Sequence, residues 1–353
     1  MISFFFYILI VLGIIEILRG RSTVQKNDNY AVYTLLVVLL ILYNGLKKYS
    51  LFSDQLGYEY NLIHLDFSEG RNNIGYQLLN IVVHYIYNDY VFLSFIVSIF
   101  VFGTYSYFIK KLSPYPCFSL FIFFITNYIM AMLAVRQYIS MAICISSIPF
   151  IFERKAMHYW ICVIVAATFH SSALIFAPIY YLYGLEFTKR NILLISIGSI
   201  IVIFGFQILI KYIVGHVAGD YAFYLDDYES ENGLGSWDRA ISKLFILFVF
   251  CVALKKHSID KGINLFTLCN MLLSFVVCAG GVGLFGVFRL KEFFLLGDVL
   301  AIPLIFKYSY RHSFFKRGMI YIGTILYIYA LVKSFWGVYE TNFINGYKFF
   351  WEL

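Results

Sequence analysis

The chain has 353 residues, of which 61% are hydrophobic and only 13% are charged. Soluble domains carry about 25% charged residues, so this composition excludes a soluble globular protein. The mean hydropathy is +0.79. Apolar runs of about 20 residues, each long enough to cross a hydrocarbon core of ~30 Å, recur along the chain. The runs are continuous, whereas a transmembrane β-barrel would alternate apolar and polar residues, so we expect helices.

The net charge of +7 does not indicate nucleic-acid binding, because the basic residues lie in short segments between apolar runs. The six cysteines lie in or beside apolar runs and have no CxxC spacing. Neither a disulfide framework nor a metal site is therefore expected. The chain carries no nucleotide-binding loop motif, and we expect no cofactor.

The first apolar run, residues 2–18, is followed by Arg19 and Arg21 and has no basic residue before it. A cleaved signal peptide has the opposite order of charges, so we expect a first transmembrane helix with its N-terminus outside. The sequence as a whole predicts one all-α, polytopic transmembrane domain over residues 1–353, with about 12 membrane segments. The expected segments are 2–18, 30–46, 89–109, 115–133, 136–152, 157–169, 171–184, 191–214, 239–254, 262–283, 290–306 and 318–338.

Basic clusters between these segments predict their orientation, because cytoplasmic loops carry an excess of Lys and Arg. All clusters fall on the inner side if residues 157–184 form two short half-helices with a tight reversal near His170–Ser172. One long tilted helix is the alternative reading of this segment. The clusters are Arg19/Arg21/Lys26, Lys110/Lys111, Arg154/Lys155, Lys189/Arg190, Lys255/Lys256/Lys261 and Lys307/Arg311/Lys316/Arg317.

This topology places the two longest polar segments, 47–88 and 215–238, on the outer face. Charged side chains near the bilayer are expensive, by ~2.5–3.5 kcal/mol at a helix centre, so those at the ends of apolar runs are functional candidates. The candidates at the outer face are Arg136, His170, Arg239 and Arg289.

Each candidate also has a structural reading. Arg136, followed by Gln137, opens an apolar run and could snorkel to the interface. Arg289 has the same alternative, and Glu292, three residues on, could be its ion-pair partner. His170 is either a hydrogen-bonded packing residue or a proton carrier and phosphate contact at the mouth of a cavity.

Arginine forks bind phosphate oxygens bidentately, and a diphosphate leaving group needs its charge neutralised in the transition state. Arginines at the outer leaflet could do this in place of a metal ion. The substrate should then be already activated and carried on a lipid. A carboxylate of the outer loop, with Asp54 as the first candidate, could act as a general base.

Two strings carry a family resemblance. Residues Arg136–Ala142 read RQYISMA, and Phe169–Ile175 read FHSSALI. Together they resemble the EpsG/Wzy-type polysaccharide polymerase family, in which a helix beginning with RQ precedes an FH-x-SAL turn. Asp54, followed by Tyr58 and Tyr60, is similar to the aspartate and tyrosines of that family's first outer loop.

Near the end of the chain, Arg289 opens an apolar helix that contains Pro303, which is similar to the family's late arginine. The resemblance implies a GT-C-like membrane glycosyltransferase in the bacterial cell (inner) membrane, with its active site facing the periplasm or exterior. It would polymerise undecaprenyl-diphosphate-linked repeat units into O-antigen, capsule or exopolysaccharide. Implied partners are these lipid-linked glycans, the bilayer, and a chain-length regulator and a flippase of the same pathway; no nucleic acid is expected.

The resemblance also implies roles for named residues. The implied catalytic residues are His170, Asp54, Arg136 and Arg289. The implied substrate-binding residues are Arg239, Gln137, Glu292, Tyr58 and Tyr224. The three arginines would contact the diphosphate, either His170 or Asp54 would deprotonate the acceptor, and Tyr224 would line a sugar groove.

Two other functions stay open. A flippase or secondary transporter predicts midplane charges and internal repeats; no repeat is visible, and Asp298 is the clearest carboxylate within a helix. An O-antigen ligase-like glycosyltransferase would use nearly the same chemistry as a polymerase.

Overall fold

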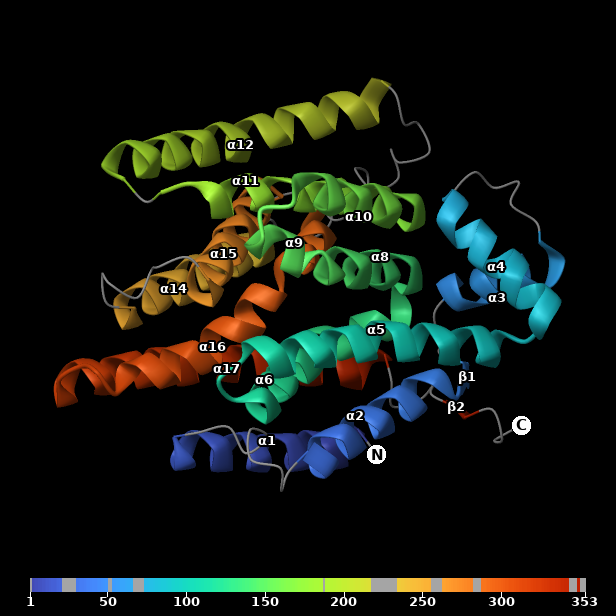
Figure 1. The fold of residues 1–353 in the computed structure, drawn as a ribbon, viewed down its shortest axis with the longest axis horizontal. Coiled ribbons are helices and arrows are strands. Elements are labelled where there is room, and N and C mark those ends of the chain that lie inside the picture. Colours follow the sequence, from blue (N-terminus) through green and yellow to red (C-terminus); the bar gives the residue numbers. More distant parts are fainter. Residues whose placement is uncertain are drawn as a thin grey trace. The chain divides into compact units, whose positions relative to one another are not determined.

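The computed structural model describes residues 2–20, 30–49, 53–65, 73–186, 188–216, 234–254, 262–281, 287–342 and 348–349 (Figure 1). Within these residues every element is helical except two short strands, β1 and β2, which pair antiparallel. Five of the described helices are long and apolar enough to cross a membrane. They cover Tyr90–Leu112, Pro116–Leu133, Val135–Phe152, Ile263–Gly280 and Phe314–Gly337.

The prediction of an all-helical membrane protein is thus confirmed in its fold class. The number of about 12 membrane segments and the GT-C-like architecture stay predictions. The expected helix ranges agree closely with the observed helices, because long apolar runs have few other ways to satisfy their backbone in lipid.

The chain divides into two compact units, each described here by itself: Met1–Ala177 with Ile328–Leu353, and Pro178–Tyr327. The first unit holds α1 (Ile2–Arg19), α2 (Tyr30–Gly45), β1 (Lys47–Tyr49), α3 (Ser53–His64), α4 (Ile74–Ile86), α5 (Tyr90–Leu112), α6 (Pro116–Phe123), η2 (Phe124–Tyr128), α7 (Ile129–Leu133), α8 (Val135–Ser146), α9 (Ile148–Phe152), α10 (Ala156–Phe169), η3 (Ser171–Phe176) and β2 (Lys348–Phe349). The second holds α11 (Pro178–Gly184), α12 (Lys189–His216), α14 (Leu234–Ala253), α15 (Ile263–Gly280), η6 (Val287–Phe294) and α16 (Leu296–Ser309). Helix α17 (Phe314–Asn342) begins in the second unit and ends in the first.

Helices α3 and α4 lie within the polar segment 47–88, where the sequence did not predict helices. They lie beside the start of α5 (Figure 1). The Leu62 carbonyl of α3 is 2.9 Å from Nδ1 of His84 in α4, which ties the two helices together. The described residues of segment 47–88 therefore form packed secondary structure and not an irregular loop.

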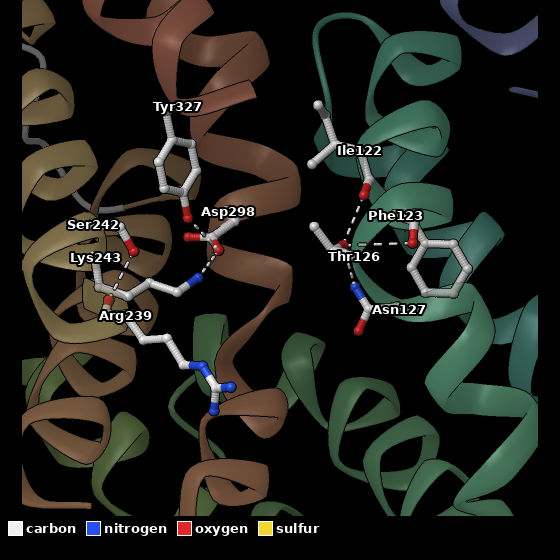
Figure 2. Close-up of polar contacts among 9 residues, drawn as sticks. All are labelled: Ile122, Phe123, Thr126, Asn127, Arg239, Ser242, Lys243, Asp298 and Tyr327. Atoms are coloured by element: carbon white, nitrogen blue, oxygen red, sulfur yellow. Dashed lines mark hydrogen bonds and ion pairs between the residues drawn. The ribbon is translucent and has the colours of Figure 1, made fainter. Parts of the chain in front are cut away.

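Helices α6, η2 and α7 form one nearly continuous rod with a π-helical turn in its middle. Within that turn the Thr126 hydroxyl donates to the Ile122 carbonyl at 2.7 Å, and the Asn127 amide donates to Thr126 Oγ1 at 2.7 Å (Figure 2). Tyr138 of α8 donates its hydroxyl to Asn127 Oδ1 at 3.2 Å. Side-chain hydrogen bonds thus stabilise a π segment, a feature that is frequent at functional sites.

A buried carboxylate meets the N-terminal end of this rod. Glu16 of α1 is fully buried, and its carboxylate accepts the backbone N–H of Phe118 at 3.1 Å. That N–H belongs to the first turn of α6, where amides lack helical partners and the helix dipole is positive. The charge of Glu16 therefore fixes α1 against α6.

The predicted reversal at His170 is confirmed. Helix α10 ends at Phe169, His170 is extended with φ −157° and ψ 116°, and η3 then runs back along α10. The Tyr159 hydroxyl of α10 donates to the Phe176 carbonyl of η3 at 2.7 Å, which only an antiparallel return allows.

A glycine contact between α2 and α5 gives the first prediction. A Cβ at Gly45 would lie 2.8 Å from Phe95 Cδ2 and 2.9 Å from Phe95 Cα. Gly45→Ala should therefore push α2 from α5 and lower the free energy of unfolding by about 1–3 kcal/mol, measured by thermal unfolding in detergent. Gly103→Ala is the control, because nothing lies within 4 Å of its added Cβ. Equal midpoints for the two variants would contradict this packing.

Candidate functional site

A break in the helical rod positions Arg136. Helix α7 ends at Leu133, Ala134 takes a non-helical conformation with φ −98° and ψ 60°, and α8 begins at Val135. Arg136 is therefore the second residue of a new helix. The break redirects the chain, so that Arg136 projects from a helix start and not from the middle of an apolar rod.

Tyrosine rings frame the Arg136 guanidinium. Its Cζ lies 5.5 Å from the ring centroid of Tyr58 and 5.9 Å from that of Tyr76. The two rings meet edge to face with centroids 5.6 Å apart, and both tyrosines are buried. Cation–π contacts of this kind hold a guanidinium in place without consuming its charge. Arg136 and Tyr58, predicted as site residues from separate parts of the sequence, thus lie together.

His170 is linked to Arg136 through α8. The Ser140 hydroxyl, one turn after Arg136 on that helix, donates to the His170 carbonyl at 3.5 Å. The His170 ring is in turn oriented by a short hydrogen bond between Nδ1 and the Ser172 hydroxyl. The RQ and FH strings therefore meet in space, as a helix start and the chain reversal beside it.

Helix α4 completes the cluster. A Cβ at Gly75 would lie 2.4 Å from Thr168 Oγ1 and 2.9 Å from Phe169 Cδ2, at the end of α10. Only glycine permits so close an approach, and the next residue along α4 is Tyr76. The contact holds Tyr76 and His170 at neighbouring ends of two helices.

Two further polar residues, which the sequence did not predict, hold the break itself. Lys47 Nζ donates to the Met132 carbonyl at 2.6 Å, and Gln55 Nε2 donates to the same oxygen at 3.2 Å. Both side chains are buried. Burial lowers the pKa of the Lys47 amine from 10.5 to about 7.

The other predicted residues of the first unit are placed in part. Asp54 lies in the first turn of α3, directly before Gln55, and its side chain lies outside the described part of the structure. Gln137 is buried in α8 beside Arg136. Tyr224, predicted to line a sugar groove, lies outside the described residues.

The second unit holds Arg239, Arg289 and Glu292. Arg239 is exposed on α14, and Arg289 is exposed on η6. Glu292 is buried on η6, a 3₁₀-helix in which residues three apart share one face. Arg289 is exposed and Glu292 is buried, and their ion pair stays a prediction from the spacing.

The same unit also contains a buried ion pair. Lys243 Nζ pairs with Asp298 Oδ2, and the Tyr327 hydroxyl donates to that oxygen at 3.2 Å (Figure 2). Arg239 lies one turn before Lys243 on α14, and its guanidinium points away from this pair (Figure 2). The sequence identifies Asp298 as a carboxylate within a helix but does not predict its partner Lys243.

These features suit anion binding. No group of three or more His, Cys, Asp or Glu side chains that could hold a metal ion occurs among the described residues. An arginine framed by aromatic rings and partly withdrawn from water binds a phosphate or carboxylate more strongly than a solvated one. The fold and this cluster define a polytopic membrane protein with a cationic site built from helix starts and a chain reversal.

The particular family follows from comparison with known families. The model of the EpsG family matches residues 30–349, and the chain belongs to that family. The matched range includes Lys47, Tyr58, Tyr76, Arg136 and His170. Comparison with curated proteins and with solved structures gave no match.

The Lys243–Asp298 pair gives a prediction about stability. Lys243→Met would leave the Asp298 carboxylate buried without its cation and should lower the free energy of unfolding by about 3–5 kcal/mol. The double variant Lys243→Met/Asp298→Leu should recover most of that loss, because no charge then remains buried. Thermal unfolding in detergent measures both, and a double variant no more stable than the single one would refute this account.

Proposed function

We propose that the protein polymerises oligosaccharide repeat units carried on undecaprenyl diphosphate into a surface polysaccharide, acting as a glycosyltransferase at the outer face of the bacterial cell membrane. The observation that carries the proposal is the Arg136 cluster. In a chain that belongs to the EpsG family, the RQ helix start, the Tyr58 helix and the FH turn come together around one framed guanidinium.

The proposed reaction transfers the growing chain as a block. A hydroxyl oxygen of one lipid-linked repeat unit attacks the anomeric carbon of the growing chain. The bond from that carbon to the diphosphate oxygen breaks, and the lipid diphosphate leaves with the bonding electrons. A base takes the hydroxyl proton. The arginines Arg136, Arg239 and Arg289 would neutralise the charge that develops on the leaving diphosphate.

His170 is the first candidate for the base. The Ser172 hydroxyl orients its imidazole, as the general acid–base role requires. Asp54 is the second, since its place in the first turn of α3 puts its backbone beside Gln55, which contacts the Arg136 junction. The aromatic rings of Tyr58 and Tyr224, with Gln137 and Glu292, would bind the sugars.

Transport of a lipid-linked glycan is the second candidate function. The observation that favours it is the Lys243–Asp298 pair, since ionisable residues inside membrane helices often mark a transport path. A ligase that transfers finished glycan differs from the polymerase only in its acceptor. A GT-C-like architecture and partnership with a flippase and a chain-length regulator form part of the polymerase proposal.

A reconstituted assay separates these functions. Purified protein in proteoliposomes, given lipid-linked repeat units, should produce a ladder of polymer lengths. Arg136→Ala should lower kcat by about 100-fold or more, because it removes a positioned charge at the leaving group. Arg136→Lys should recover only part of the loss, since an ammonium lacks the guanidinium fork.

Lys155→Met, at an exposed surface position, is the control and should give the wild-type ladder. A full ladder from Arg136→Ala would overturn the proposed site. Movement of labelled lipid across the bilayer, with no new glycosidic bond, would support the transporter instead.

The outward orientation of the site has its own test. Cys162 and Cys251, the two native cysteines that are not buried, are first changed to serine. In this background a new cysteine then replaces Ser171 or Lys155, both of which are exposed. A membrane-impermeant maleimide should label Ser171→Cys in intact cells. Lys155→Cys should react only after permeabilisation, because the basic Arg154/Lys155 turn is expected inside. The reverse pattern would contradict an outer-face site.

A further inference from the structure

Lys47 is a buried ionisable residue whose side chain enters the first unit beside the Arg136 cluster. It is 1% exposed, and its ammonium donates to the Met132 carbonyl at 2.6 Å. Taking an ammonium out of water costs several kcal/mol, and a neutral residue could satisfy a carbonyl at less cost. A lysine at this position therefore calls for an explanation beyond packing.

The carbonyl that Lys47 contacts lies at the C-terminal end of helix α7. In an uninterrupted helix the Met132 carbonyl would accept the amide four residues on, which is that of Arg136. The break at Ala134 opens the helix at this point, and Lys47 and Gln55 both donate to the Met132 oxygen. The negative end of the α7 dipole lies here, so a cation is favoured.

The backbone that carries Lys47 is anchored on both sides. Just before it, the Asn44 amide donates to Ser98 Oγ at 2.8 Å, and Gly45 packs directly on Phe95 of α5. Lys47 itself is in β1, in register with Phe349 of β2. The ammonium is therefore presented to α7 from a fixed frame.

The helix that carries Gln55 also carries Tyr58, whose ring lies against the Arg136 guanidinium. Lys47 and Gln55 thus bind the junction at Met132, and Tyr58 contacts it at Arg136, four residues later. A shift of the Met132 carbonyl would turn the start of α8 and move Arg136 within its tyrosine frame.

We propose that Lys47 is a positioning residue of this site: with Gln55, its amino group holds the α7–α8 break by hydrogen bonding and so sets the direction of Arg136. The inference rests on the proposed function only for its catalytic consequence. The conformational consequence, a fixed junction between α7 and α8, holds whatever the protein acts on.

The conformational test uses hydrogen exchange of the purified protein, read by mass spectrometry on peptides within residues 130–140. Lys47→Met should raise exchange there at least about tenfold, since opening of the junction no longer breaks the hydrogen bond from Lys47 to Met132. Lys47→Arg, which keeps a cationic donor, should stay within about threefold of wild type. If Lys47→Met does not fold, Gln55→Leu and Lys47→Gln give the same readout.

The matched control is Tyr33→Phe. It also removes one buried hydrogen bond to a main-chain carbonyl in the first unit, from the Tyr33 hydroxyl to Ser106 at 2.9 Å, but from α2 and not from β1, which carries Lys47. It should lower the melting temperature without changing exchange within residues 130–140. Equal exchange in Lys47→Met and Tyr33→Phe would overturn the proposal.

The kinetic test uses the polymerisation assay. Lys47→Met should lower kcat/KM by about 10- to 100-fold through misplaced Arg136, and Lys47→Arg should restore most of it. Lys47→Met and Gln55→Leu should be clearly non-additive when combined, because both act on one carbonyl. Strictly additive losses would contradict the proposal that Lys47 and Gln55 act together on the Met132 carbonyl. If the wild type forms no polymer but exchange responds as described, the proposed function fails and the positioning role of Lys47 stands.

Discussion

The first unit depends on how the ends of one buried helical rod are satisfied. The rod formed by α6, η2 and α7 lies among apolar side chains, where its unpaired terminal amides and carbonyls cannot be left to water. A carboxylate, Glu16, meets its positive end at Phe118, and an ammonium, Lys47, meets its negative end at Met132. Each charge compensates a helix dipole end that would otherwise be costly to bury.

The contacts at the C-terminal end of this rod also shape the candidate site. Because Lys47 and Gln55 satisfy the Met132 carbonyl, the rod can end before Arg136 without an orphaned acceptor, and α8 can start in a new direction. A helix start is where an arginine can leave the apolar bundle and still be held by packed neighbours. The tyrosines of α3 and α4 supply that hold, and α10 closes on α4 through the Gly75 contact. The same contacts thus end helix α7, compensate its dipole and place Arg136.

The sequence predicted the helices well, because continuous hydropathy is a local property that the bilayer enforces. It also predicted that the chain reverses at His170. Through the family resemblance it named Arg136 and Tyr58 as site residues; the structure places the two side by side, and their roles stay predictions. The sequence predicted the interruption between residues 133 and 136, but it could not predict the Lys47 contact, because Lys47 and Met132 lie 85 residues apart in the sequence. Lys243 did leave a signal: a lysine inside one apolar run and Asp298 inside another are each too costly to bury alone, so they should pair.

The two units hold their arginines in different ways, and the difference bears on what each can do. Arg136 is framed by two tyrosine rings, and Lys47 and Gln55 bind the Met132 carbonyl just before it, which suits a group that must already be in place when charge develops. Arg239 and Arg289 are exposed side chains of the second unit. On the proposed function, Arg136 supplies the positioned charge at the leaving diphosphate, and Arg239 and Arg289 add further cationic contacts to it.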